Sequence, residues 1–239
     1  MSNKTIRETR REKRQQQQRR QLTRNLIVIF GVVLLVASGL IYASTRPVGD
    51  VVEITPRDLP NPDGRQLGNP DAPVVMEVFE DFQCPACRSF TEDVEPALIE
   101  NYIKTGQVLF IYRFYPFLDD RSTTKESDQA ANASMCAAEQ DRFWDYHDML
   151  FANQAGENRN AFSNRRLQAF AETLGLDMEG FNACFEDNKY RAEINQDLAL
   201  ARERLVTGTP TVFINGQILP NFSYATISGA IEAALASAP

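Results

Sequence analysis

Apolar and polar positions follow two different periods from about residue 64 onward. Residues 74–79 and 108–114 are short apolar runs rich in Val and Phe, which is typical of buried strands. The segment between them, residues 85–102, begins with a proline and has the turn spacing of a helix. A strand, a helix and a second strand in this order predict a right-handed parallel crossover.

A long helical stretch follows the second strand. Residues 130–151 contain neither Pro nor Gly and carry a broad apolar face. Ser163 and Asp177 are suited to cap two further helices, and residues 190–205 have the pattern of another. The sequence therefore predicts that helices at about residues 120–207 interrupt the sheet.

Strands return near the C-terminus. The apolar runs at residues 211–214 and 217–219 flank an Asn-Gly dipeptide, which is the strongest short signal of a β-hairpin. Residues 227–236 then predict a closing helix. The whole pattern predicts one α/β domain over residues 64–239 with a helical insertion.

The first 45 residues have a different composition. Residues 25–45 carry no charged side chain, and residues 26–43 are almost wholly apolar. At 1.5 Å per residue such a helix crosses the roughly 30 Å core of a bilayer, so we expect one transmembrane helix. A cleaved signal peptide is the alternative, because a basic region precedes the apolar run. The run exceeds the roughly 7–15 residues of a signal core, which favours an uncleaved anchor.

Charge is divided unevenly around this segment. Residues 1–24 carry nine basic and two acidic side chains, and the excess of positive charge predicts a cytoplasmic tail. Beyond residue 45 the chain has 16 basic and 30 acidic side chains, a formal charge of −14. We therefore expect a single-pass protein of the cell membrane with a hydrated, extracytoplasmic domain. So acidic a domain argues against nucleic acid as a partner.

The predicted organisation has four parts. Residues 1–24 form the basic cytoplasmic tail and residues 25–45 the transmembrane anchor. Residues 46–63 contain four prolines among polar residues and predict a semi-rigid linker that holds the domain near the membrane. The domain itself is expected at residues 64–239.

Two cysteines lie where the first predicted strand meets its helix. Cys84 and Cys87 are separated by Pro85 and Ala86, and Pro85 suits the first helical turn because its missing N–H is not needed there. Unpaired backbone N–H groups at a helix start favour an anion, so a thiolate at Cys84 would have a lowered pKa. Cys87 lies on the same side of the helix. The spacing permits a reversible dithiol.

A zinc site and an inert apolar pair are the alternatives for these cysteines. Zinc needs further Cys or His ligands at close spacing, and the sequence offers no second pair. His147 is the single histidine, on a predicted helical face with Phe143, Trp144 and Tyr146, where a structural role is favoured. We therefore predict no metal ligands and favour redox chemistry.

Cys136 and Cys184 both lie in the predicted helical insertion. In an oxidising compartment two leftover cysteines of one region seldom both stay free. The sequence places neither beside a thiol, a closely spaced basic residue or a helix start that would activate it. We expect a structural disulfide between two helices, with two buried free thiols as the alternative.

Four motifs together resemble a known family. They are Gly68-Asn69-Pro70-Asp71-Ala72-Pro73-Val74, Glu80-Asp81-Phe82-Gln83-Cys84-Pro85-Ala86-Cys87, Phe143-Trp144-Asp145-Tyr146-His147 and Gly208-Thr209-Pro210-Thr211-Val212-Phe213-Ile214-Asn215-Gly216. From about residue 64 to the end, the chain resembles the DsbA-type thiol-disulfide oxidoreductases, in particular the membrane-anchored bacterial members. The resemblance implies a thioredoxin-like fold.

The resemblance also implies roles for particular residues. Thr209-Pro210 is expected to form a cis peptide facing the cysteines, with the backbone of Thr209 contacting substrate and tuning the dithiol. Pro85 and Ala86 are expected to tune it as well. The best-known oxidase of this type has His where this chain has Ala86, so the helix terminus must do more to stabilise the thiolate. Glu80 and Asp81 would, if close, oppose it.

The expected activity is that of an oxidase that donates the Cys84–Cys87 disulfide to reduced exported proteins. Cys84 is expected to be the exposed nucleophile and Cys87 the more buried, resolving thiol. The exchange needs no cofactor, and a quinone-linked membrane partner would reoxidise the pair. A reductase or isomerase is the alternative within this class, since direction depends on reduction potential. A dithiol module that binds a metal or a partner is the alternative outside it.

Overall fold

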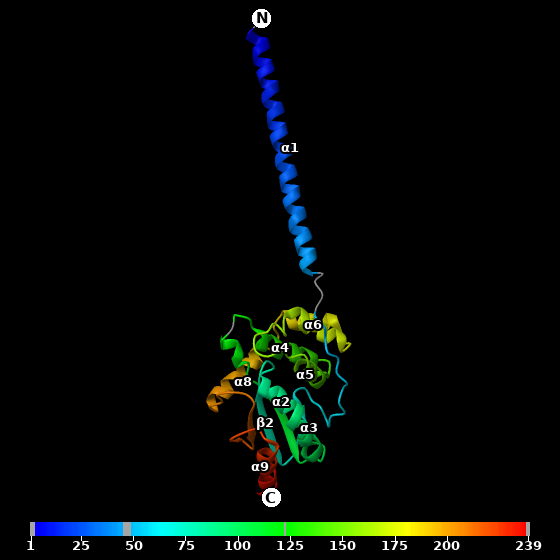
Figure 1. The fold of residues 1–239 in the computed structure, drawn as a ribbon, viewed down its shortest axis with the longest axis vertical. Coiled ribbons are helices and arrows are strands. Elements are labelled where there is room, and N and C mark those ends of the chain that lie inside the picture. The colour runs from blue at the N-terminus through cyan, green and yellow to red at the C-terminus, as the bar shows by residue number, and fades with distance from the viewer. Residues whose placement is uncertain (1–2, 45–48, 122, 238–239) are drawn as a thin grey trace. The chain divides into compact units, whose positions relative to one another are not determined.

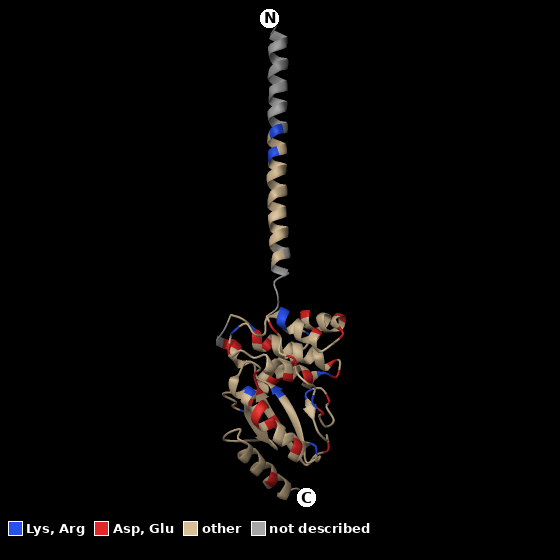
Figure 2. Ribbon diagram, turned by 45° about the vertical axis from the view of Figure 1, so that its right-hand side comes forward, with Lys and Arg blue, Asp and Glu red and all other residues tan. Residues whose placement is uncertain are grey.

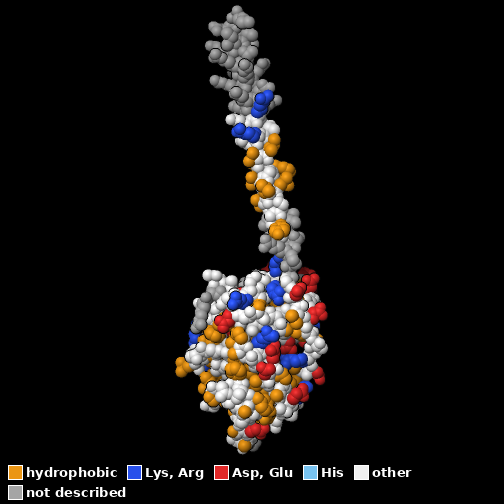
Figure 3. Space-filling view, viewed as in Figure 1, with side chains coloured by type: hydrophobic (Ala, Val, Ile, Leu, Met, Phe, Trp, Pro, Cys, Tyr) orange, Lys and Arg blue, Asp and Glu red, His pale blue; other side chains and the backbone are white. Residues whose placement is uncertain are grey.

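A computed structural model describes residues 3–44, 49–121 and 123–237. The chain divides into two compact units, Met1–Pro47 and Val48–Pro239. In the first unit, α1 (Asn3–Ser44) is, within these described ranges, the one helix apolar and long enough to cross a membrane, with a mean hydropathy of 2.0 over Arg20–Gly39. Exposed hydrophobic side chains, among them Leu26, Phe30 and Leu35, follow the helix beyond Arg24 (Figure 3). The predicted N-terminal apolar helix is confirmed, although Thr45, its predicted last residue, lies outside the described residues.

The second unit is built on a five-stranded sheet with the strand order β1-β3-β2-β4-β5. The parallel pair β2 and β3 lies at its centre, and the other neighbouring strands are antiparallel. The strands are β1 (Gln66–Leu67), β2 (Val74–Glu80), β3 (Val108–Phe114), β4 (Thr211–Ile214) and β5 (Gln217–Ile218). The predicted crossover and C-terminal hairpin are therefore present. β1 was not predicted, because two residues in a turn-rich stretch show no periodicity.

Alternate residues of β2 face two different cores. Val74, Met76 and Val78 belong to the larger core, which is shared with the helices that follow β2 and with α9 (Tyr224–Ser237). Phe79 points the other way, into a smaller core with Ala201 of α8 (Arg191–Glu203). This period of two places the side chain of Glu80, the last residue of β2, on the face of the larger core.

The helix predicted at residues 85–102 is present but irregular. It consists of α2 (Pro85–Ser89), the π-helical turn η1 (Phe90–Val94), α3 (Glu95–Leu98) and a second π-helical turn, η2 (Ile99–Ile103). Pro96 accounts for the first widening, because its ring would clash with the carbonyl of Glu92, four residues earlier. The N–H of Glu95 accordingly bonds to the carbonyl of Phe90, five residues back.

Within the described residues, five α-helices lie between β3 and β4, after the short 3-10 helix η3 (Phe117–Arg121), which confirms the helical insertion. They are α4 (Glu126–Ala138), α5 (Phe143–Ala152), α6 (Asn164–Thr173), α7 (Met178–Glu186) and α8, and Figure 1 shows α4, α5 and α6 grouped at one end of the sheet. The Asp177 side chain caps α7, as predicted, by accepting from the N–H groups of Glu179 and Gly180. Ser163 precedes α6 without a side-chain capping bond.

The long helical stretch predicted at residues 130–151 is present, but it is broken into two helices. α4 ends at Ala138 and α5 begins at Phe143. Between them Asp141 has a φ of 57°, a left-handed conformation that Asp tolerates at a helix end, and the N–H of Arg142 bonds to the carbonyl of Ala137. A helix can therefore stop here without Gly or Pro.

The predicted linker, residues 46–63, is also corrected. From residue 49 onward this segment packs against the domain, and residues 46–48 lie outside the described residues. The Asn153 side chain accepts from the N–H of Val52 at 2.8 Å and donates to its carbonyl at 2.9 Å. Val51, Ile54 and Leu59 pack against the larger core. The prolines suit an extended segment, but its apolar residues and backbone bonds make it part of the domain.

Candidate active site

Cys84 lies where the loop after β2 becomes a helix. It is the N-cap residue of α2, with an extended backbone (φ −75°, ψ 120°), and Pro85 follows at the first helical position. The N–H of Cys84 bonds to the carbonyl of Asp81 at 2.9 Å, which closes the turn. Cys84 is 7% exposed and Cys87 fully buried. Cys84 is thus the more accessible thiol, although it is far more covered than the sequence suggested.

The two thiols have opposite pKa shifts. A hydrogen bond from the Cys87 thiol, together with the backbone N–H groups of Cys87 and Ala86, lowers the pKa of Cys84 to about 6, even though burial opposes this. Burial raises the pKa of Cys87 well above its ordinary value, and the hydrogen bond to Cys84 adds to that effect. Cys84 is therefore a thiolate near pH 7, and Cys87 remains protonated.

A buried carboxyl group lies behind Cys87. Glu80 is 1% exposed, and its side chain is directed into the larger core. Burial raises its pKa well above the ordinary value, with further contributions from Glu95 and Cys84, whereas a hydrogen bond with Cys87 lowers it. Burial thus opposes the ionisation of this carboxyl group, which lies close enough to the resolving thiol for the two to affect each other's pKa.

Asp81 ties the loop before Cys84 to the helical insertion. Its carboxylate accepts from the Ser127 hydroxyl at 2.6 Å and from the N–H groups of Gln83 and Leu118 at 2.9 and 3.1 Å. Burial raises the pKa of Asp81 to about 7 against these bonds. Because burial holds back the ionisation of both Glu80 and Asp81, their expected opposition to the Cys84 thiolate is reduced.

The loop before β4 closes the other side of the site. The Thr209-Pro210 peptide bond is cis, as the resemblance implied. Cys84 Sγ lies 3.3 Å from the Thr209 carbonyl oxygen, to which the thiol donates when it is protonated. The structure thus brings Thr209 to the reactive sulfur. Pro85 is exposed next to Cys84, while the partly buried Ala86 packs against the larger core and presents no charge to the thiolate.

Sequence reasoning missed one residue of this site. The side-chain amide of Gln154, just after α5, donates to the carbonyls of Phe82 and Cys84 at 2.7 and 3.0 Å. It therefore holds the backbone on which the reactive thiol is mounted. A single Gln about 70 residues from the cysteines shows no pattern that would have revealed it.

The remaining sequence candidates lie in the helical insertion. A disulfide joins Cys136 of α4 to Cys184 of α7, and both residues are buried. His147 is fully buried among aromatic rings, with its ring centroid 4.9 Å from that of Phe151. Its Nδ1 lies 3.0 Å from a carboxylate oxygen of Asp148. These contacts agree with a structural role for His147.

In this site a helix that begins with Cys-x-x-Cys faces a loop that contains a cis-proline. Comparison with known proteins shows which family has this arrangement. Residues 60–233 match the family model described as thioredoxin. The chain belongs to this family. A probable disulfide bond formation protein D from Bacillus cereus is 31% identical over 163 residues, which cover 66% of this chain and 73% of the relative. The resemblance inferred from the four motifs is confirmed.

Solved structures agree with this assignment. Oxidised BdbD from Bacillus subtilis is 28% identical with a TM-score of 0.66, and the match covers 79% of this chain and all of that one. The predicted thioredoxin-like fold is thereby confirmed. A Na⁺/H⁺ antiporter, NhaA 3, from Salinispora tropica is 34% identical over 180 residues, but the chain spans 26% of that protein's length, so its name assigns no activity here.

Proposed function

We propose that the protein is an extracytoplasmic thiol-disulfide oxidase that donates the Cys84–Cys87 disulfide to exported proteins. The observation that carries this is the lowered pKa of Cys84 at a helix start beside a fully buried Cys87. A thiolate that is stable in the reduced protein favours reduction of the disulfide, so the oxidised protein tends to pass its disulfide on. The relatives named disulfide bond formation proteins support this direction.

The exchange takes place in two displacements. A substrate thiolate attacks Cys84 Sγ, the bond to Cys87 breaks, and Cys87 leaves with the electron pair and takes up a proton. The second thiolate of the substrate then attacks its own sulfur in the mixed disulfide and displaces the Cys84 thiolate. The substrate gains a disulfide and the protein becomes a dithiol. Cys84 is the nucleophile of the return reaction, in which a membrane partner that passes electrons to quinone reoxidises the pair.

Neighbouring residues have supporting roles in this proposal. Thr209 and Pro210 present backbone to the substrate beside Cys84, and Pro85 and Ala86 tune the dithiol by starting the helix without adding charge. The Cys136–Cys184 disulfide staples α4 to α7 and takes no part in the exchange. The distinct elements that carry the two cysteine pairs support this division of roles.

The proposed location is the cell membrane, with the N-terminus in the cytoplasm and the domain outside. The apolar helix supports anchoring, and the nine basic side chains that precede residue 25 support the orientation. Acidic side chains are spread over the domain (Figure 2). A tether of this kind keeps the domain close to a membrane partner by raising the effective concentration.

The experiment that tests the function uses the full-length oxidised protein and a reduced, unfolded substrate. We expect the substrate to gain its disulfides while Cys84 and Cys87 become thiols. Cys84→Ser should abolish the transfer, and Cys87→Ser should trap a mixed disulfide with the substrate. Rapid insulin reduction with no oxidation of the substrate would identify a reductase, and bound metal in the purified protein would favour a binding module; either result would overturn the proposal.

A further inference from the structure

The loop that follows α5 bonds to the turn that carries the reactive thiol. The side-chain amide of Gln154 donates to the carbonyls of Phe82 and Cys84, at 2.7 and 3.0 Å. Four residues further along the loop, the N–H of Asn158 donates to the side-chain oxygen of Gln83 at 2.6 Å. Three consecutive residues that end at Cys84 therefore each accept a hydrogen bond from this loop of the helical insertion.

These bonds lie in the interior of the domain. Phe82 and Gln83 are each 1% exposed, and Gln154 is 8% exposed. The Cys84 carbonyl also accepts from the N–H of Arg88 at 3.2 Å, as the first carbonyl of a helix does. Removing the Gln154 amide would take a donor away from two buried carbonyls, a change that a protein interior tolerates poorly.

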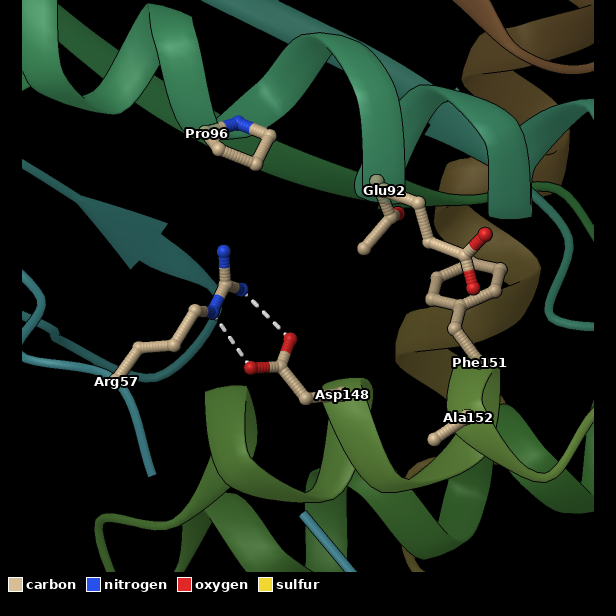
Figure 4. Close-up of a pocket in the computed structure, with 7 residues that line it drawn as sticks. Arg57, Glu92, Pro96, Asp148, Phe151 and Ala152 are labelled. Carbon is tan, nitrogen blue, oxygen red and sulfur yellow. Dashed lines mark hydrogen bonds and ion pairs between the residues drawn. The ribbon is translucent and has the colours of Figure 1, made fainter. Parts of the chain in front are cut away.

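Gln154 is itself fixed in position by its neighbours. Asn153, the residue before it, exchanges two hydrogen bonds with the backbone of Val52. The preceding helix, α5, is held by Arg57, which donates from Nε and Nη2 to Asp148, both at 2.6 Å (Figure 4). Nη1 of Arg57 donates to Glu95 at 2.8 Å, on the helical segment that carries Cys87. The loop after α5 is therefore braced against the segment that bears the cysteines.

The backbone conformation of Cys84 determines how well its sulfur is stabilised as an anion. The bond from the Cys87 thiol contributes most to the lowered pKa of Cys84, and the backbone N–H groups of Cys87 and Ala86 add to it. These N–H groups reach the sulfur because Cys84 is an extended N-cap residue. The Gln154 amide holds this residue at its carbonyl and offsets the partial negative charge of that carbonyl beside the thiolate.

We propose that Gln154 is a positioning residue of the redox reaction, which holds the helix start toward Cys84 Sγ and so makes the Cys84–Cys87 disulfide a stronger oxidant. It acts through the backbone of Cys84. The step that it favours is the one in which the second substrate thiolate attacks its own sulfur in the mixed disulfide: the bond to Cys84 Sγ breaks, and Cys84 leaves with the electron pair as a thiolate. The inference rests on the proposed dithiol function.

The first test measures the ionisation of Cys84 in the reduced full-length protein. Gln154→Met keeps the length of the side chain and removes both N–H donors. The rate of Cys84 alkylation against pH has its midpoint near pH 6 in the wild type. We expect a midpoint near about pH 7 in Gln154→Met, a roughly tenfold fall of the ionisation constant that is of the size of lost amide hydrogen bonds. A merely structural role would lower stability without moving this midpoint.

The reduction potential gives a second readout. Wild-type Gln154 stabilises the thiolate and hence the reduced protein, so its loss should lower the potential. At pH 8 Cys84 is ionised in both proteins, and a tenfold change in the equilibrium constant of this two-electron couple corresponds to about 30 mV. We therefore expect the potential of Gln154→Met to lie about 30 mV below that of the wild type in the same glutathione buffers.

Gln140→Met is the matched control. Gln140 also bonds to backbone through its side chain, donating to the carbonyl of Asp177 at 3.1 Å and accepting from its N–H at 2.8 Å. These bonds lie at the start of α7, in an element that carries neither Cys84 nor Cys87. The Gln140→Met substitution should leave both the midpoint and the potential at their wild-type values.

Gln154→Asn keeps the test decisive where Gln154→Met does not fold, as checked by thermal unfolding. Its amide is shorter by one methylene and reaches the two carbonyls less well, so both shifts should keep their sign and be smaller. A wild-type midpoint and potential in folded Gln154→Met, or in Gln154→Asn in its place, would overturn the proposal, as would equal shifts in Gln140→Met. Wild-type protein whose Cys84 does not ionise near pH 6 would overturn the proposed function as well.

Discussion

The Sγ atom of Cys84 lies 3.3 Å from the carbonyl oxygen of Thr209, a residue 125 positions further along the chain. The two meet because β4 pairs antiparallel with β2, which brings the loop before β4 beside the helix start after β2. A reactive sulfur and the half-buried loop before β4 thus share one site. Neither segment forms this site by itself.

The ionisation of Cys84 gives a direct prediction for its reactivity. With a pKa of about 6, its thiolate fraction rises with pH and passes one half near pH 6. Alkylation of the reduced protein should therefore accelerate between about pH 5 and pH 7 and then level off, whereas Cys87 should react slowly throughout. Peptide mapping after timed alkylation measures the labelling rates of Cys84 and Cys87 separately. Equal labelling of the two cysteines at pH 7 would contradict their assigned roles.

The disulfide in the helical insertion predicts a change of stability without loss of activity. Cys136 and Cys184 are 48 residues apart, and the chain-entropy model assigns a loop of this size at most about 4 kcal/mol. Replacing both with Ala should lower the free energy of unfolding by about 2–4 kcal/mol, as measured by denaturant titration. Disulfide transfer by the folded variant should remain at the wild-type level, and its loss would show that the bond serves the redox site.

The docked segment that follows residue 48 predicts a destabilising substitution. Arg57→Gln removes the guanidinium that pairs with Asp148 and with the buried Glu95, and should lower the free energy of unfolding by about 2 kcal/mol, allowing for the partial exposure of Arg57. Limited proteolysis should then cut near residues 50–57 sooner.

Arg88→Gln is the matched control, because Arg88 forms an exposed i,i+4 pair with Glu92 on the same helical segment. Loss of this exposed pair should lower the free energy of unfolding by only about 0.3–0.5 kcal/mol. Equal effects of the two substitutions would show that residues 50–57 are a linker, as their composition suggested.

Much of the fold follows from the periodicity of the sequence. Local residue patterns were enough to predict three features: the strand at residues 74–79, the hairpin around Asn215 and the helix cap at Asp177. The break after Ala138 does not, because Asp141 adopts a left-handed conformation without the Gly that usually marks one. The ion pairs of Arg57 could not be predicted either, because the two carboxylates that bind it lie 38 and 91 residues away in the sequence.

The site was predictable in its cysteines but not in their surroundings. Cys84 and Cys87 were found from spacing, and Thr209 from the family resemblance. The sequence placed Glu80 near the thiols as an opposing charge, but its burial, which raises its pKa, depends on the completed core. Gln154 reaches the site through tertiary packing alone.

The reduction potential of the Cys84–Cys87 pair tests the central claim most directly. Full-length protein is equilibrated with glutathione buffers of known potential, and the fraction of oxidised protein is measured by thiol labelling. Because the Cys84 thiolate stabilises the reduced form, we predict a potential clearly above the roughly −270 mV of thioredoxin and toward the roughly −120 mV of DsbA. A potential at or below about −270 mV would contradict the account, since such a disulfide would form at the expense of its substrates rather than be donated to them.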